Sequence, residues 1–225
     1  MLSLPEELLL LALKEQEGTV VHAASMALSY GLAGGILLEL FSLDKIEFQD
    51  KYLRIADAVR TGDPILDEAM DLMDQAGKAF GAQHWVETFA RKIKHLKERL
   101  LDRLIEKGIL RREEHKILWV FTAKHYPAQD LRPETELRTR VHAAVLEGVE
   151  PDDRTRSLLV LVHACNLVGE LFEKPQRKAA TENLKRIAED SPVGKAIADT
   201  LLAIQLAINA AVMNAVIASA VTTHR

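Results

Sequence analysis

The stretch ARKIKHLKERLLDRLIEKG, residues 90–108, shows most clearly that helices build this chain. Its apolar residues recur at the spacing that places side chains on one face of an α-helix: Ile93, Leu96, Leu100 and Leu104. Gly108 follows them, and glycine commonly ends helices. The pattern therefore predicts one continuous helix from Ala90 to Lys107.

The same stretch is rich in basic residues, and its acidic residues gather towards the C-terminal half. Lys94 and Lys97 are three positions apart, so on a continuous helix they lie side by side. A charged helix face is often only a solvated surface. Neighbouring cations also form sites for anions, and phosphate is the usual ligand. Both interpretations remain open at this point.

An apolar segment directly follows the basic stretch. GILRREE (108–114) and ILWVFTA (117–123) predict a β-hairpin with its turn near Glu114–Lys116. Residues 117–121 are all apolar, more than one face of a strand requires. A basic surface beside an apolar tip is typical of peripheral membrane proteins, which predicts that Ile117, Leu118 and Trp119 enter the membrane interface. The alternative is that the hairpin pairs with a second copy and forms a homo-oligomer.

The rest of the chain also reads as mainly helical. Ser3, Pro5 and Glu6 predict a helix start, with a stop at Gly18. GLAGG (31–35) predicts either a backbone break or a close contact between helices. The remaining expected elements are a helix over Val21–Tyr30, a strand around Lys45–Phe48 with a turn at Gln49–Asp50, a helix capped by Asp63 and Pro64, and helices over Glu136–Glu147, Asp153–Phe172 and Arg177–Ala188.

The C-terminal segment Ile197–Val221 is apolar and long enough to cross a bilayer. Its many alanines and its polar interruptions favour a buried core helix over a membrane span: Asp199, Gln205, Asn209 and Asn214. The acidic residues within the first apolar stretch lead us to expect no signal peptide there. The expected fold is a single mainly α domain over residues 1–225, built around this buried helix, with a projecting β-hairpin.

Composition and motifs exclude several classes of function. The net charge of −4 argues against a general nucleic-acid binder. Cys165, the single cysteine, lies in an apolar stretch, which predicts a buried thiol in a reducing compartment. The sequence contains neither a metal-binding histidine motif nor a nucleophile or nucleotide motif, so we expect no metal, no cofactor and no enzymatic activity. An unrecognised hydrolase or transferase is the remaining rival.

Several blocks of sequence, in order, resemble the Golgi phosphoprotein 3 family. They are LSLPEELLLLALKEQEG, YGLAGGILLEL, TGDPILDEAM, LKERLLDRLIEKGIL with the following hairpin, and RSLLVLVHACNLV. The resemblance covers nearly the whole chain. It implies a mainly helical domain around a buried apolar helix, and a peripheral membrane protein that binds phosphatidylinositol 4-phosphate.

The resemblance also implies which residues contact the lipid headgroup. Lys94 and Lys97 fall where the family has its basic pair, and Arg99 matches a further basic position. The family's headgroup site also includes a tryptophan and an arginine, and this chain has Ala24 and Ala33 at those positions. The expected partners are therefore anionic phospholipid headgroups at a membrane surface.

Golgi members of the family have a basic, disordered arm before the folded domain, whereas the family blocks begin almost at Met1 here. We therefore expect a minimal, prokaryotic-type member. Its expected location is the cytoplasm with reversible membrane association. The cytosolic face of the Golgi follows only if the chain is eukaryotic.

Overall fold

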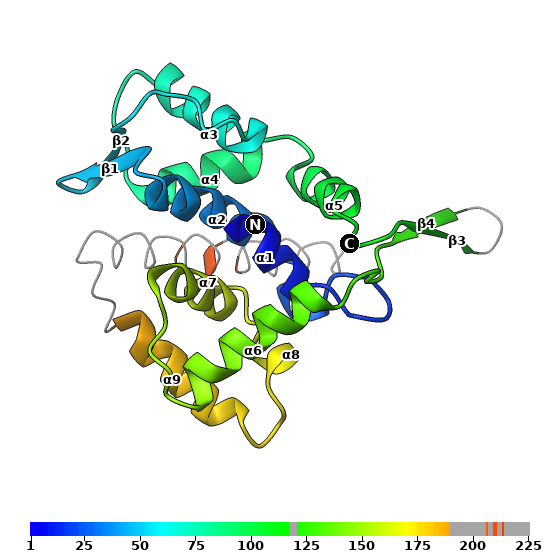
Figure 1. Cartoon of the computed structure of the whole chain (residues 1–225). Helices are drawn as coiled ribbons and strands as arrows, with labels where there is room; N and C mark the ends of the chain where they lie inside the picture. The colour runs from blue at the N-terminus through cyan, green and yellow to red at the C-terminus, as the bar shows by residue number, and fades with distance from the viewer. Residues whose placement is uncertain (118–120, 190–205, 207–208, 211–212, 214–225) are drawn as a thin grey trace, which may run out of the picture.

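The computed structural model describes residues 1–117, 121–189, 206, 209–210 and 213 (Figure 1). This part of the chain is mainly helical and includes a β-hairpin that projects from the helices, which confirms the expected fold class. Its helices are α1 (Leu4–Leu11), the 3₁₀ helix η1 (His22–Ala24), α2 (Leu28–Ser42), α3 (Pro64–Gln75), α4 (Ala82–Lys92), α5 (Leu96–Glu106), α6 (Arg132–Leu146), α7 (Asp153–Ala164), α8 (Val168–Leu171) and α9 (Arg177–Glu189). Its strands are β1 (Ile46–Gln49), β2 (Tyr52–Ile55), β3 (Glu113–Ile117) and β4 (Phe121–His125).

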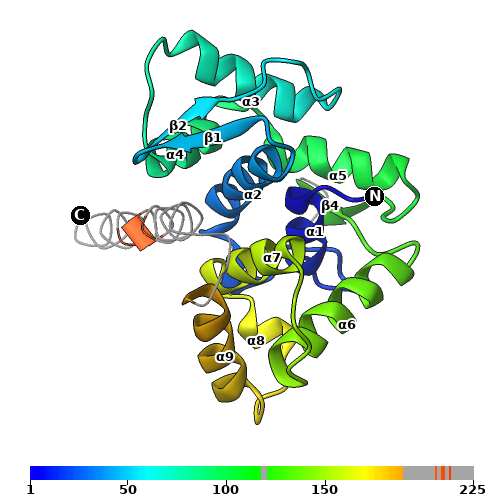
Figure 2. The same cartoon turned by 60° about the vertical axis from the view of Figure 1, so that its left-hand side comes forward.

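Helix α2 occupies the middle of the described structure. In both views it lies between a group formed by α3, α4 and the β1–β2 pair and a second group formed by α7, α8 and α9 (Figures 1 and 2). It contacts α1, α4 and α7. Most of its side chains are buried, from Leu32 to Leu40 without interruption. The apolar core is therefore arranged around α2.

The glycines of GLAGG permit this central position. Helix α2 runs straight through them, so the expected close helix contact is confirmed and the backbone break is wrong. A Cβ atom on Gly31 would lie 2.3 Å from the Cys165 sulfur, and one on Gly35 would lie 3.1 Å from the Pro5 nitrogen. Only glycine allows α1 and the end of α7 to approach α2 this closely. The expected helix over 21–30 is also wrong, because η1 and a turn precede α2.

Cys165 is buried against α2, as expected. Burial raises the pKa of its thiol to about 12, because the apolar surroundings disfavour the thiolate. We expect the native protein to react with Ellman's reagent only as fast as the structure opens. The same protein unfolded in urea should release one equivalent of the reagent's coloured thiolate at once. Full reaction of the native protein within the mixing time would contradict this burial.

The N-terminal helix begins as predicted but ends early. The Ser3 N–H donates to Glu6 Oε2 at 2.7 Å, and Pro5 lies in the first turn. The helix ends at Leu11 rather than at Gly18, because the chain then folds back and Leu13 pairs with Val20. Gly18, with φ of +59°, lies in this reversal.

The β1–β2 hairpin and the start of α3 agree with the sequence. β1 and β2 are antiparallel, and Asp50 in the connecting turn has a φ of +57°. Asp63 caps α3 by accepting the Ile65 N–H at 2.8 Å, and Pro64 is the first helical residue. Both features are set by residues adjacent in the sequence.

The predicted helix from Ala90 to Lys107 is wrong in one respect. The chain forms two helices, and His95 between them adopts the left-handed conformation with φ of +53°. Ile93 and Leu96 on either side are both buried, and α4 and α5 both contact α2. Packing against α2 therefore outweighs the helical pattern. Gly108, with φ of +71°, ends α5 as predicted.

The hairpin exists, but its turn lies further along than predicted. Glu114–Lys116 belong to β3, which pairs in antiparallel register with β4 from Glu113↔His125 to Ile117↔Phe121. Residues 118–120, which connect the two strands in the sequence, lie outside the described residues. At the base, Tyr126 N–H donates to Gly18 O at 3.0 Å. A Cβ on Gly18 would lie 2.1 Å from the Tyr126 carbonyl carbon, so only glycine fits there.

The C-terminal half departs from the sequence expectation at two places. The expected helix over 153–172 is divided into α7 and α8 by Asn166, which has a φ of +56°. The expected buried helix over 197–221 lies outside the described residues except at Leu206, Asn209, Ala210 and Met213. These four residues are helical and exposed, so burial is not found at these positions. None of the helices in the described part combines the length and apolar character needed to span a membrane.

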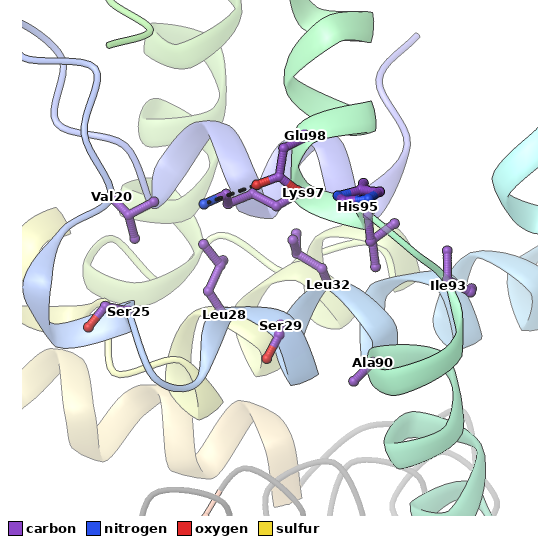
Figure 3. A pocket seen from close by; sticks show the side chains of 11 residues that line it. Val20, Ser25, Leu28, Ser29, Leu32, Ala90, Ile93, His95, Lys97 and Glu98 are labelled. Atoms are coloured by element: carbon purple, nitrogen blue, oxygen red, sulfur yellow. Dashed lines mark ion pairs between the residues drawn. The ribbon is translucent and has the colours of Figure 1, made fainter. Parts of the chain in front are cut away.

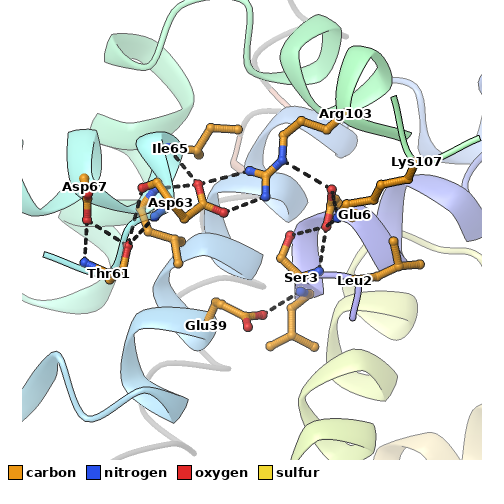
Figure 4. A network of polar contacts seen from close by, with 12 residues as sticks. Leu2, Ser3, Glu6, Glu39, Thr61, Asp63, Ile65, Asp67, Arg103 and Lys107 are labelled. Carbon is orange, nitrogen blue, oxygen red and sulfur yellow. Dashed lines mark hydrogen bonds and ion pairs between the residues drawn. The ribbon is translucent and has the colours of Figure 1, made fainter. Parts of the chain in front are cut away.

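Ion pairs join the elements around the start of α1. Glu6 is fully buried, and its Oε1 lies 3.3 Å from Arg103 Nε and 2.6 Å from Lys107 Nζ (Figure 4). Arg103 also pairs with Asp63 at 2.6 Å, and Glu39 Oε2 accepts the Leu4 N–H at 2.6 Å. These contacts connect α1 to α2, α3 and α5.

A second set of ion pairs holds α1 to α6 and α7. Arg154 of α7 places Nε 3.1 Å from Glu7 Oε1 and Nη1 3.3 Å from Glu39 Oε1, and it donates to the Leu2 carbonyl. Arg140 of α6 lies 2.7 Å from the other oxygen of Glu7. Both carboxylates are nearly inaccessible to solvent, with Glu7 4% and Glu39 8% exposed. Because buried carboxylates need partners, Arg154 is central to this cluster.

Candidate functional site

A cavity of about 390 Å³ lies where the α4–α5 turn faces the beginning of α2 (Figure 3). For convenience we call it the α5 cavity. Its apolar wall comes from α2, the end of α4 and the segment before η1, and its polar groups come mainly from the first turn of α5. The lining residues are Val20, Ser25, Leu28, Ser29, Leu32, Ala90, Ile93, His95, Leu96, Lys97 and Glu98.

Lys97 is the basic group of this cavity. Its side chain extends across the cavity towards Val20 and Leu28, and its Nζ lies 3.5 Å from Glu98 Oε1 (Figure 3). The pair is half-exposed, so it is weak and leaves the ammonium group able to contact a ligand. The cavity also lies at the N-terminal end of α5, where the helix dipole favours an anion. Its chemistry therefore suits a phosphate or a carboxylate.

Two polar residues of the cavity were not anticipated. The Ser29 hydroxyl has no hydrogen-bond partner among the described residues, and His95 lies on the opposite side of the cavity from Val20 (Figure 3). Both can hydrogen-bond to hydroxyl or phosphate oxygens. They come from separate segments of the chain, and His95 reaches the cavity only because the helix is interrupted there. No sequence signal indicated either residue.

Lys94 lies in the turn before α5, exposed to solvent. The prediction that it lies beside Lys97 on one helix is wrong, because α4 ends at Lys92 and α5 begins at Leu96. Lys94 does not line the cavity. Within the described residues neither it nor the adjacent Arg91 and Lys92 has an ion-pair partner. These three exposed cations are therefore free to meet an anion, although they are outside the lining of the cavity.

Arg99 is engaged elsewhere. Its Nη1 lies 2.5 Å from Glu68 Oε2 of α3, and it does not line the α5 cavity. The structure thus does not bring it to Lys97, and its pairing indicates a role in joining α5 to α3. The sequence did not reveal this partner because Glu68 precedes Arg99 by 31 positions.

Ala24 and Ala33, which the resemblance aligns with the family's tryptophan and arginine, are fully buried. Ala24 belongs to η1 and Ala33 to α2, and neither lines the cavity. The α2 side of the cavity is formed instead by Leu28, Ser29 and Leu32. Among the described residues, no guanidinium group lines this cavity, so its recognition of an anion depends on lysine.

The hairpin leaves the far end of α5. Ile117 is the last residue of β3, and Leu118 and Trp119 lie outside the described residues. Helix α5 has 11 residues, so the cavity and the hairpin base are separated by about 16 Å along its axis. The segment from Gly18 to Val20 contacts both, since Gly18 binds the hairpin base and Val20 lines the cavity.

Within the described residues, no group of three or more histidine, cysteine, aspartate or glutamate side chains is arranged to hold a metal ion. A second cavity, of about 300 Å³, lies between β2, α3 and α4. Sequence reasoning did not anticipate it, because its walls come from three separate segments.

Comparison with known proteins finds similarity to a protein family and to individual relatives. The model of the Golgi phosphoprotein 3 (GPP34) family matches residues 4–204 of this chain. The chain is also similar to vacuolar protein sorting-associated protein 74 of Eremothecium gossypii, with 28% identity over 161 residues. That similarity covers 62% of this chain and 48% of the other protein, so the chain spans about half the length of this relative.

Proposed function

The chain belongs to the Golgi phosphoprotein 3 family, and on this premise we propose that it is a non-enzymatic peripheral membrane module that binds anionic phospholipid headgroups. Lys94 and Lys97 contact the headgroup phosphate, and the protein docks reversibly on a cytoplasmic membrane face. The observation that best supports this proposal is the α5 cavity, which Lys97 lines from the first turn of α5, with the exposed Lys94 in the turn just before that helix.

Phosphatidylinositol 4-phosphate is the lipid that the family resemblance implies. Lysine presents a point charge and lacks the planar fork with which arginine binds phosphate in two places. Because the cavity has lysine and no arginine or tryptophan among its lining residues, we expect attraction to anionic headgroups in general. Selection of the 4-phosphate over other anionic groups is expected to be weak.

The hairpin supplies the second membrane contact in this proposal. Each basic residue near an anionic surface contributes about 1 kcal/mol, and each fully buried apolar side chain about 1.5–3 kcal/mol. Neither contribution alone holds a protein firmly, whereas two together do. The proposed inserting residues are Ile117, Leu118 and Trp119. Arg99 is not assigned to the headgroup site, because it pairs with Glu68.

Vesicle flotation tests this proposal. We expect binding to increase with the fraction of phosphatidylserine or phosphatidylglycerol in phosphatidylcholine vesicles, and to fall as salt screens the lysines. Vesicles that contain phosphatidylinositol 4-phosphate should bind the protein about as well as these vesicles do when the surface charge is matched. Equal binding to neutral and anionic vesicles would contradict the proposal.

The two strands of the hairpin pair only with each other in the described structure, which favours a second candidate: contact with another copy of the chain. Sedimentation of the wild type and Trp119→Ala separates the candidates. A loss of mass without a loss of vesicle binding favours the oligomer, and the reverse favours membrane insertion.

A further inference from the structure

The second cavity, between β2, α3 and α4, has the features of a ligand site. Its volume of about 300 Å³ lies at the lower end of the range for small-molecule sites. It shares no lining residue with the α5 cavity. Its walls are formed by Leu53, Arg54, Ile55, Met73, Asp74, Gly77, Lys78, Ala79 and Trp85.

The floor of this cavity is apolar and firmly held. Leu53, Met73 and Trp85 are all buried. The Leu53 N–H donates to Phe80 O at 2.8 Å, which fixes β2 against the segment before α4. The Trp85 ring meets Phe80 edge-on at a centroid distance of 5.7 Å and packs against Phe89 at 5.8 Å. The floor is therefore preformed for an apolar group.

Trp85 has an unusual feature for a buried tryptophan. Its side chain is 1% exposed, and its Nε1–H has no hydrogen-bond partner within the described part of the chain. Buried indole N–H groups usually find an acceptor, because an unsatisfied buried donor is unfavourable. Trp85 lines the cavity, but its Nε1 is itself sealed from solvent, so the residue contributes its ring to the cavity and not this donor.

The rim of the cavity is positively charged on balance. Arg54 and Lys78 stand against one carboxylate, Asp74, and all three side chains are exposed. Neither cation has an ion-pair partner among the described residues, and Lys78 Nζ lies 4.9 Å from the Phe80 ring centre. Two cations against one anion favour a ligand with a negative head group.

From these features we propose that the second cavity binds a small amphipathic carboxylate. The apolar part of the ligand lies on Leu53 and Met73, and its carboxylate contacts Arg54 and Lys78. This site is independent of the membrane-binding proposal, because the two cavities share no residue. Ligand binding at this cavity and vesicle binding are therefore separate measurements, and either proposal can fail without the other.

Equilibrium dialysis of the full chain with octanoate tests the proposal, with octanol as the uncharged probe. The wild type should bind octanoate saturably, at one site, and more tightly than octanol. Arg54→Gln with Lys78→Gln should weaken binding about tenfold, because it removes two charged contacts that are exposed and therefore individually weak. Lys51→Gln with Lys174→Gln removes two exposed lysines outside the cavity; it is the matched control and should bind as the wild type does.

A second measurement follows the ligand through the fluorescence of Trp85, which lines the cavity. In a Trp119→Phe chain Trp85 is the remaining tryptophan, and octanoate should change its fluorescence. Absence of saturable binding, equal binding by the Arg54 and Lys78 variant, or equal affinity for octanol would each overturn the proposal.

Discussion

Replacing Arg154 with methionine is expected to lower the free energy of unfolding by about 3 kcal/mol. Its side chain pairs with Glu7 and Glu39 and donates to the Leu2 carbonyl, so its loss removes one partner from each of two buried carboxylates. Glu7 keeps Arg140, and Glu39 keeps the Leu4 N–H. The Arg154 side chain is 22% exposed, which places the effect at the lower end for buried ion pairs.

Urea denaturation followed by circular dichroism measures this effect. The matched control is Arg132→Met, which removes an arginine that is 85% exposed and paired only with Asp130 at the surface. Its midpoint should equal that of the wild type, because solvent screens such pairs. Equal midpoints for both variants would show that the cluster around Glu7 and Glu39 does not stabilise the fold.

The sequence predicted those features that adjacent residues determine. The starts of α1 and α3 were found because Ser3 and Asp63 cap their own helices, and the end of α5 was found because Gly108 adopts a positive φ at no steric cost. The interruptions at His95 and Asn166 were missed. Both are non-glycine residues in the left-handed conformation. Asn166 adopts it in a local helix ending, where the Leu167 N–H donates to Val162 O at 3.0 Å, whereas histidine at position 95 gives no signal of it in the sequence.

The candidate site was predicted in part, for a similar reason. Clustered lysines are visible in a sequence, whereas their partners are not. Lys97 lines the α5 cavity, but Arg99 is paired with Glu68 of another helix. Ser29 and His95 join the site only through the packing of α2 against the α4–α5 turn. Long-range contacts of this kind have no signature in the spacing of residues.

Reversing the charge of Lys94 and Lys97 together, to glutamate, is expected to weaken binding to anionic vesicles about a thousandfold. Each substitution removes an attraction of about 1 kcal/mol and replaces it with a repulsion of similar size. Two such changes sum to about 4 kcal/mol. The measurement is the partition coefficient from vesicle sedimentation at low salt, with thermal unfolding to verify that both variants fold.

The control must change the net charge equally, because repulsion between a more acidic protein and an anionic membrane would also weaken binding. Lys174→Glu with Lys178→Glu meets this need: both lysines are exposed near the start of α9, which lies across the domain from α5 in both views (Figures 1 and 2). Each substitution changes the charge by −2, so both double variants go from −4 to −8. Only the Lys94 and Lys97 variant should lose most of its binding. An equal loss in both variants would indicate a response to total charge, and full binding by both would place the membrane contact away from the α5 cavity.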